Sequence, residues 1–446
     1  GASVGVYGPL VHFGATVSAF IRRLKFMPKI PHDIIIGCGV AAAISAGFGA
    51  PLAGLIFAHE TVLRHFSMKA ITALAVSSMA ANFFASEINL VTPFLLLPEI
   101  PFVISDVLPS LAIIGPIAAI VAVIFMKLII FLGTLPPKFK IKNWQSPVIA
   151  GLFCGLFGMF FDEVLGLGTN TVMMVITSNQ DTSYLLALLV GKLLLSCICL
   201  GFGFFGGTFS PALFLGAIVG ALVFQLPLTS MNIDFLSILA VSGMAAVSSS
   251  VIGAPITAII LVLELTGSYE YAIAATFPIV VCSFITSRVF GNSLFDKQLI
   301  SRGIAITKGR EQIILNEVLI EEYADKQYTK FSLNTSKETA IKLLVKNNTT
   351  EGYIISKENK YMGKISLINL VNKKNPDLSN YIEKNPLIIN QKSNLLEVIK
   401  SLSEFVGESI PIINKETNEM IGIISENDVL GAYLDISEEI NQIEKH

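Results

Sequence analysis

Eleven apolar stretches occupy the first two thirds of the sequence, and several of them are too short to cross a bilayer upright. A spanning helix needs about 20 apolar residues, whereas several of these have only about 14–17 and are broken by Gly-Pro, Ser-Pro or Ala-Pro pairs. Hydrocarbon offers no partner to backbone groups freed at such breaks, so broken helices are tolerated only where they are buried in protein or line a cavity. The pattern predicts a multi-pass α-helical membrane domain with a transport pathway. The stretches are 10–25, 33–47, 51–66, 68–90, 106–133, 145–160, 183–203, 211–226, 235–250, 255–266 and 270–290.

The same region contains an internal repeat. Residues 5–9 match 207–211 at an offset of 202, and residues 49–52 match 253–256 at an offset of 204. Ordered matches at nearly one offset are typical of inverted-repeat transporters, whose substrate site lies at the interface between the repeats. Tight packing of small residues is the alternative explanation, but it accounts for the glycines and not for their order.

Charge divides the chain into two parts. Residues 1–300 hold 25 of the 64 Lys, Arg, Asp and Glu residues, which is a bilayer composition, and the remainder has an ordinary soluble composition. We expect a membrane domain at 1–303, a linker at 304–315 and a soluble domain at 316–446. Within the last, short strands alternate with amphipathic helices over 336–369 and again over 393–428, which predicts a pseudo-symmetric pair of α/β modules.

Composition also excludes several classes of partner. A net charge of −2 and the lack of a basic run argue against nucleic acid. All five cysteines lie in apolar segments, and the spacing of Cys197 and Cys199 suits neither a redox nor a zinc site, so we expect no metal. The chain opens at Gly1 inside a Gly-rich turn, from which we expect it to begin in the middle of a fold.

The repeated turns can bind an anion. Each leads into an apolar helix, whose first N–H groups have no partner within the helix and carry the positive end of the helix dipole. Two such ends meeting within the membrane would hold an anion without a full positive charge. That binding is favourable but weak, as conduction requires.

These motifs resemble those of the CLC family of chloride channels and transporters. Residues 5–9 are similar to the family's Gly-Arg-Glu-Gly-Pro motif, and 207–211 to its Gly-x-Phe-x-Pro motif. Residues 49–61 resemble the paired helices that follow the first motif, and 293–295 the start of the final helix. The resemblance covers 1–300 almost without a gap, and residues 316–446 are similar to the CBS pair that many members carry.

The resemblance implies the function and its setting. It implies a homodimer in a lipid bilayer with one anion pathway in each subunit, a cytosolic CBS tail, no enzymatic activity and no required cofactor. Chloride would be the substrate. The retained turn at 207–211 favours chloride, although the loop that sets selectivity against nitrate or fluoride in the family is not in this chain.

The resemblance also implies which residues meet the anion. Backbone amides of Thr208 and Phe209 would bind the central anion, and those around Val6, Tyr7 and Gly8 would bind it further out.

Three positions depart from the family pattern. Tyr7 replaces the gating glutamate, and a phenol with a pKa of about 10 stays neutral at pH 7. Thr61 replaces the inner proton-transfer glutamate of the exchangers, and Phe295 replaces a tyrosine that contacts the central anion. The substitutions predict passive, voltage- or ligand-modulated anion conduction without proton coupling. A CLC-type chloride/proton antiporter is the alternative, and core packing is a competing interpretation of Tyr7 and Phe295.

Two further pairs of residues have predicted roles. Ser425 and Asp428 match the CBS pattern in which a hydroxyl and a carboxylate hold the ribose of an adenine nucleotide; a purely structural dimerisation role is the alternative. Glu60 and its repeat mate Glu264 are expected to satisfy helix ends or each other's surroundings.

Two rival functions fail on residue content. A zinc protease helix needs a second histidine four residues after the first, but the position four residues after His59 is Leu63. A divalent-cation transporter needs several carboxylates in its membrane path, and Glu60 and Glu264 are nearly alone there.

Overall fold

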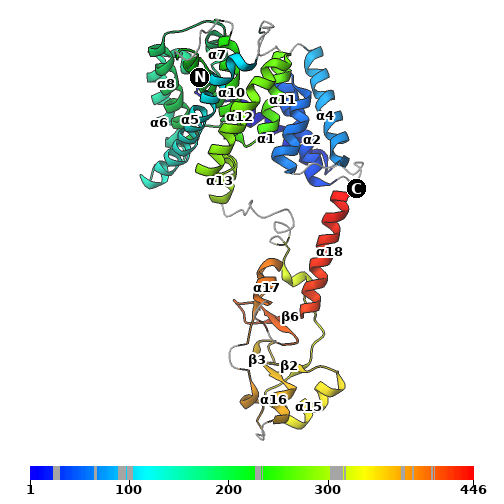
Figure 1. Cartoon of the computed structure of the whole chain (residues 1–446). Coiled ribbons are helices and arrows are strands. Elements are labelled where there is room, and N and C mark those ends of the chain that lie inside the picture. The colour runs from blue at the N-terminus through cyan, green and yellow to red at the C-terminus, as the bar shows by residue number, and fades with distance from the viewer. Residues whose placement is uncertain are drawn as a thin grey trace. The chain divides into compact units, whose positions relative to one another are not determined.

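The chain divides into two compact units, Gly1–Arg302 and Gly303–His446. Figure 1 shows both units of this computed structural model. The structure describes residues 1–23, 31–64, 68–88, 97, 104–226, 233, 235–301, 315, 318–372, 377–383, 386–402, 405 and 407–445. Most of the expected linker, residues 304–314, lies outside the described residues.

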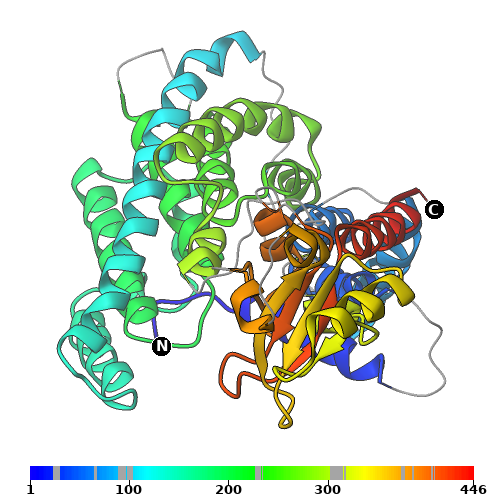
Figure 2. The ribbon, with the colours of Figure 1, turned by 90° about the horizontal axis from the view of Figure 1, so that it is seen from below.

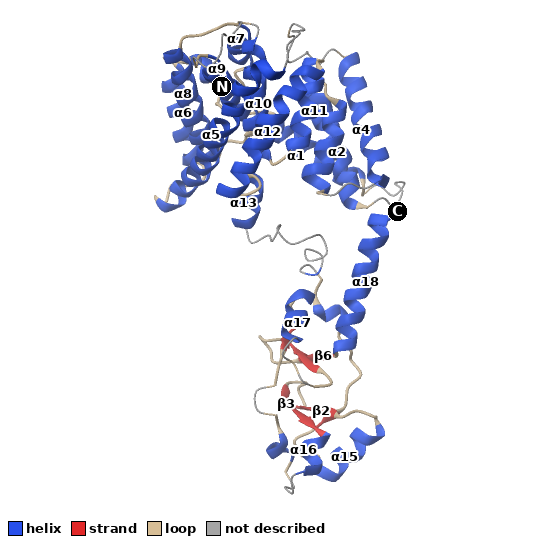
Figure 3. Ribbon diagram, in the orientation of Figure 1, coloured by secondary structure: helices blue, strands red, loops and turns tan. Residues whose placement is uncertain are grey.

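The named elements of the first unit, where it is described, are all helices (Figure 3). They follow the apolar stretches closely, except for the helices at 162–164, 169–177 and 294–301, which lie outside those stretches. The first repeat holds α1 (Tyr7–Ile21), α2 (His32–Phe48), α3 (Pro51–Phe57), the π-helical turn η1 (Ala58–Leu63) and α4 (Met68–Glu87). The rest holds α5 (Ile104–Lys138), α6 (Gln145–Gly158), η2 (Asp162–Val164), α7 (Thr169–Thr177), α8 (Thr182–Gly201), α9 (Phe209–Phe224), α10 (Phe235–Ile252), α11 (Pro255–Thr266), α12 (Tyr269–Val289) and α13 (Leu294–Ser301).

Of the described helical segments, four are long and apolar enough to cross a membrane: 104–138, 182–201, 235–252 and 269–301. Others, including α2, α9 and α11, are apolar but shorter. The centre of the unit is the pair α9 and α10. Nearly every residue of both helices is buried, as expected for helices that are apolar on all sides. Glycines let the two backbones touch: a Cβ on Gly220 would lie 2.1 Å from the carbonyl oxygen of Leu239.

The repeat is visible in how the helices begin and end. Both α3 and α11 start with a proline in the first turn, where the missing N–H costs nothing. Both follow a glycine with positive φ, Gly49 at 68° and Gly253 at 82°. The matching sequence motifs therefore fold into matching backbone turns.

The second unit contains two three-stranded sheets of the same topology. In each sheet the first strand pairs parallel with the second, and the second pairs antiparallel with the third. Figure 2 shows these yellow and orange strands with the helices that flank them. The elements are η3 (Ile320–Tyr323), β1 (Lys330–Phe331), α15 (Lys337–Lys346), β2 (Glu351–Ile355), β3 (Tyr361–Ser366), α16 (Leu367–Asn372), η4 (Leu378–Tyr381), β4 (Ile389–Asn390), α17 (Leu395–Leu402), β5 (Ile410–Ile413), β6 (Met420–Ile424) and α18 (Glu426–Lys445).

A buried ion pair connects the two modules of this unit. Lys364 Nζ lies 2.8 Å from Glu351 Oε1 and donates to the carbonyl oxygen of Ser409, also at 2.8 Å. The other oxygen of Glu351 accepts from the backbone N–H of Ser409 at 2.9 Å. The hydrogen bonds from this pair to Ser409 join the two modules, and both buried charges have partners.

Candidate anion pathway

The two repeated turns meet directly. Gly5 and Gly207 form an antiparallel bridge, in which the N–H of Gly5 donates to the Gly207 oxygen at 2.8 Å and the N–H of Gly207 donates to the Gly5 oxygen at 2.6 Å. A Cβ on Gly8 would lie 2.8 Å from the Cα of Gly207, so glycine is required for this approach. The bridge brings the N-termini of α1 and α9 together from opposite repeats.

Unsatisfied polar groups gather at the start of α9. The side-chain hydroxyls of Thr208 and Ser210 are buried and have no hydrogen-bond partner in the described part of the chain. Thr208 precedes α9, and no side chain caps the free N–H groups of its first turn. Buried hydroxyls without a protein partner are available to a water or an ion, and the positive end of a helix favours an anion.

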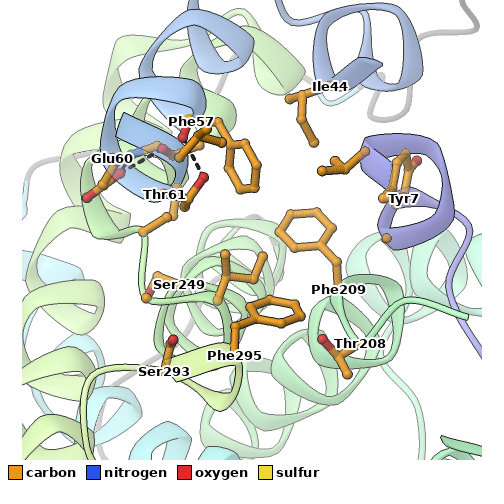
Figure 4. Close-up of a pocket in the computed structure, with 18 of the residues that line it drawn as sticks. Tyr7, Ile44, Phe57, Glu60, Thr61, Thr208, Phe209, Ser249, Ser293 and Phe295 are labelled. Carbon is orange, nitrogen blue, oxygen red and sulfur yellow. Dashed lines mark hydrogen bonds between the residues drawn. The ribbon is translucent and has the colours of Figure 1, made fainter. Parts of the chain in front are cut away.

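A cavity of about 490 Å³ opens beside these turns (Figure 4). Of the residues that the sequence predicts for the pathway, Tyr7, Gly8, Thr61, Thr208, Phe209 and Phe295 all line this cavity. Val6 does not line it, and its side chain is 51% exposed. Figure 4 shows Tyr7 and Thr61 on opposite sides of the cavity, with the ring of Phe209 between them.

Three aromatic rings form the wall at the Tyr7 side. Tyr7 stacks on Phe48 with 3.7 Å between ring centroids and an angle of 15° between planes. Phe209 meets both rings edge-on, at 5.8 Å from Tyr7 and 5.1 Å from Phe48. Sequence reasoning missed Phe48, although it directly precedes the repeated Gly-Ala-Pro motif. The Tyr7 ring is therefore held by ring contacts on two sides.

The polar groups on the opposite wall already have partners. The Thr61 hydroxyl donates to the Phe57 carbonyl oxygen, one helical turn back, at 2.6 Å. Glu60 accepts hydrogen bonds from the N–H of Ile256 at 3.0 Å and from both the N–H and the hydroxyl of Thr257, at 2.8 and 2.7 Å. Glu60 thus caps the N-terminus of α11.

Glu264 makes the reciprocal contact. Its carboxylate accepts from the N–H groups of Leu52 and Ala53, at 2.8 and 2.7 Å, and so caps the N-terminus of α3. The acceptors and donors of the two caps correspond at the same offset of 204 residues. The prediction that this pair satisfies helix ends is confirmed.

Phe295 stands at the end of the cavity where α13 begins. Its side chain is 41% exposed, and it lies in the first turn of a helix capped by the Ser293 hydroxyl, which accepts from the N–H of Asp296 at 3.1 Å. Asp296 pairs with Arg64 at the same end. Sequence reasoning missed this ion pair, because 232 residues separate its members.

In the second unit, Ser425 and Asp428 close on each other. The hydroxyl and the N–H of Ser425 both donate to Asp428 Oδ2, at 2.7 and 2.8 Å, and the N–H of Asp428 donates to the Ser425 hydroxyl at 3.3 Å. This is a capping box at the start of α18. Both side chains are part-exposed, so a ribose hydroxyl would compete for groups that now bind each other.

Comparison with known proteins identifies the family. The model of the voltage gated chloride channel family matches residues 1–288, and the CBS domain model matches residues 378–435. The chain therefore belongs to the voltage gated chloride channel, or CLC, family. It is a multi-pass membrane protein with a soluble CBS-type C-terminal domain, and its family membership supports anion transport.

The relatives agree with this assignment. The H(+)/Cl(-) exchange transporter ClcA of Vibrio cholerae serotype O1 (strain M66-2) is 26% identical over 325 residues, which cover 70% of this chain and 68% of that protein. A slow cyanobacterial Cl-/H+ antiporter has a similar structure, with a TM-score of 0.59, 21% identity and coverage of 69% of this chain and 74% of its own. A eukaryotic CLC transporter has a TM-score of 0.58 at 16% identity, covering 96% of this chain and 77% of its own. At these identities the two structures support the fold alone.

Proposed function

We propose that this protein conducts chloride, or a similar small anion, passively and without coupling to protons, under the control of voltage or a ligand. The observation that carries the proposal is the position of Tyr7. Its ring lies at the N-terminus of α1, beside the bridge to α9 and against Phe209, on the wall of the cavity. An uncharged ring there narrows the pathway sterically, and a phenol does not exchange protons near pH 7.

The opposite wall of the cavity, which holds Thr61 and Glu60, supports the same proposal. A proton-coupled path needs a titratable group that is free to take up and release a proton. Thr61 has no such group, and its hydroxyl is bonded within its own helix. Glu60 beside it is engaged by three donors from the start of α11.

A chloride/proton antiporter is the second candidate. The names of the curated relatives favour it, since they are H(+)/Cl(-) exchange transporters. Such an antiporter would need a proton route that avoids both Tyr7 and Thr61.

The reversal potential in planar bilayers separates these two candidates. Passive conduction predicts a reversal potential that follows the chloride gradient and does not move when a pH gradient is imposed at constant chloride. An antiporter predicts a shift set by both gradients, and that shift would contradict the proposal.

The proposal includes a homodimer with one pathway in each subunit. Its support is family membership, together with exposed apolar side chains that must face either lipid or a partner, such as Phe83, Phe84, Val280 and Phe284. Mass measurement of the purified protein in detergent tests this point, and a monomer alone would contradict it.

The tail's role as a nucleotide sensor stays a prediction. Binding of adenine nucleotide at Ser425 and Asp428 would break their mutual hydrogen bonds at the start of α18. Titration of the full-length protein with a fluorescent ATP analogue should show binding that Asp428→Ala removes. Binding that survives this substitution would exclude the site.

A further inference from the structure

The end of the cavity at α13 carries an ion pair that the proposed conduction does not use. Arg64 follows η1 in a left-handed backbone conformation, with φ of 59°, and its side chain is 42% exposed. Asp296 lies in the first turn of α13, and its side chain is 14% exposed. Arg64 Nη2 and Asp296 Oδ1 are 2.5 Å apart, and both residues line the cavity.

Arg64 is the sole arginine or lysine among the described residues that line this cavity. His12 on α1 is the other basic side chain of the wall. Of the two acidic residues among the described lining residues, Glu60 is held by the N-terminus of α11, which leaves Asp296 as the group that opposes Arg64. The pair therefore decides how much positive charge an anion meets at this end of the cavity.

The two members of the pair differ in their access to water. Arg64 is nearly half exposed, whereas Asp296 is largely covered and fixed on a capped helix turn. A part-exposed ion pair is weak, so an anion arriving from water can compete with the aspartate for the guanidinium. Cavities with walls of low polarity focus the field of such a charge on the passing ion.

From this arrangement we infer that Arg64 recruits anions into the pathway, and that Asp296 limits how strongly it does so. The inference rests on the proposed anion conduction. It adds an anion-binding site at the α13 end of the cavity, separate from the helix N-termini at Gly5 and Gly207.

Chloride flux from liposomes tests the inference with Asp296→Asn, Arg64→Gln and the double variant. At low ionic strength and subsaturating chloride, Asp296→Asn should raise flux about two- to fivefold, the range that a part-exposed ion pair represents. Arg64→Gln should lower flux by a similar factor, and the double variant should match Arg64→Gln. An impermeant salt should shrink these differences, because the Debye length falls to about 10 Å at 0.1 M.

Matched controls separate recruitment from a structural clamp. Arg64→Lys keeps the charge and should keep both the flux and its salt dependence. Glu270→Gln removes an exposed charge at the start of α12 and should change neither. If the pair only clamps α13, both single variants lower flux regardless of salt, and that result overturns the inference, as does unchanged flux in all variants. Wild-type protein that passes no anion at all would overturn the proposed function, and the inference with it.

Discussion

The N-termini of α1 and α9 are built from the same turn but stand in different surroundings. Nearly every residue of α9 is buried, whereas Ser18 is the one buried residue of α1. At the start of α9, the Thr208 and Ser210 hydroxyls are buried without partners, which suits a fixed anion site. At the start of α1, Tyr7 presents a part-exposed ring. The repeat therefore supplies two similar helix ends, and we propose that the α9 end binds an anion while the α1 end obstructs its path.

The two repeats remain equivalent at the reciprocal helix caps that join them. Glu60 caps α11 and Glu264 caps α3 through corresponding backbone groups. The repeats therefore keep their mutual caps and differ at the residues that we propose to contact the ion.

Breaking the contact between the turns should have the largest effect. Gly8→Ala places a Cβ 2.8 Å from the Cα of Gly207, a backbone atom that cannot rotate away. Overpacking of this kind costs about 1–3 kcal/mol, so we expect flux in liposomes to fall about tenfold or more. Gly155→Ala is the matched control, because nothing lies within 4 Å of its added Cβ. Equal flux in both variants would show that the turns need not touch.

Removing the Tyr7 ring should raise flux severalfold. Tyr7→Ala leaves the N-terminus of α1 in place but removes the ring that stacks on Phe48. Tyr7→Phe keeps the stack and should remain close to wild type if the obstruction is steric. Tyr7→Glu should introduce a pH-dependent gate without exchange, because Thr61 still interrupts the inner route. Unchanged flux in a folded Tyr7→Ala variant would mean that Tyr7 is only packing.

Neutralising Glu60 or Glu264 should lower the stability of the protein by similar amounts. Glu60→Gln and Glu264→Gln each weaken a helix cap, which is worth about 1 kcal/mol. Thermal unfolding in detergent should show a lower Tm for both, with Glu60→Gln at least as affected because the Glu60 carboxylate accepts from three donors and that of Glu264 from two. A lower Tm in one variant alone would show that the two caps do not stabilise the protein equally.

The last prediction concerns the Thr208 hydroxyl, whose removal should leave the fold intact. Thr208→Val keeps the shape of the side chain and removes one buried polar group. A single hydrogen bond to a charged group is worth about 1.5–3 kcal/mol, and the backbone amides remain, so chloride affinity should fall while the fold persists. Calorimetric titration with chloride measures the change. Unchanged affinity would place the anion away from this hydroxyl.

Much of the fold could be predicted from the sequence. Apolar stretches located nearly all helices of the first unit, because burial and hydrocarbon demand the same residue types. The helix α7 was not predicted, since it begins with Thr-Asn-Thr and its continuous apolar run, residues 172–176, is too short to stand out as a helix. The order of the repeat predicted a site at the interface between the repeats, where the turns at Gly5 and Gly207 meet.

The site was only partly predictable. Residues within the repeated motifs could be placed, since motif and backbone turn correspond. Phe48 and the Arg64–Asp296 pair could not, because their roles arise from tertiary contacts that no local pattern encodes. The Glu60 and Glu264 caps lie between these cases, because the repeat shows that they correspond but not which helix each one caps.

Proton movement in liposomes tests the central claim most directly. Purified protein is reconstituted with a chloride gradient, potassium and valinomycin, and internal pH is followed with a fluorescent dye while a chloride electrode records flux. Because neither Tyr7 nor Thr61 can carry a proton near pH 7, we expect chloride to leave with no uphill proton movement. Protons driven uphill in a fixed ratio to chloride would contradict the account and assign the protein to the exchangers.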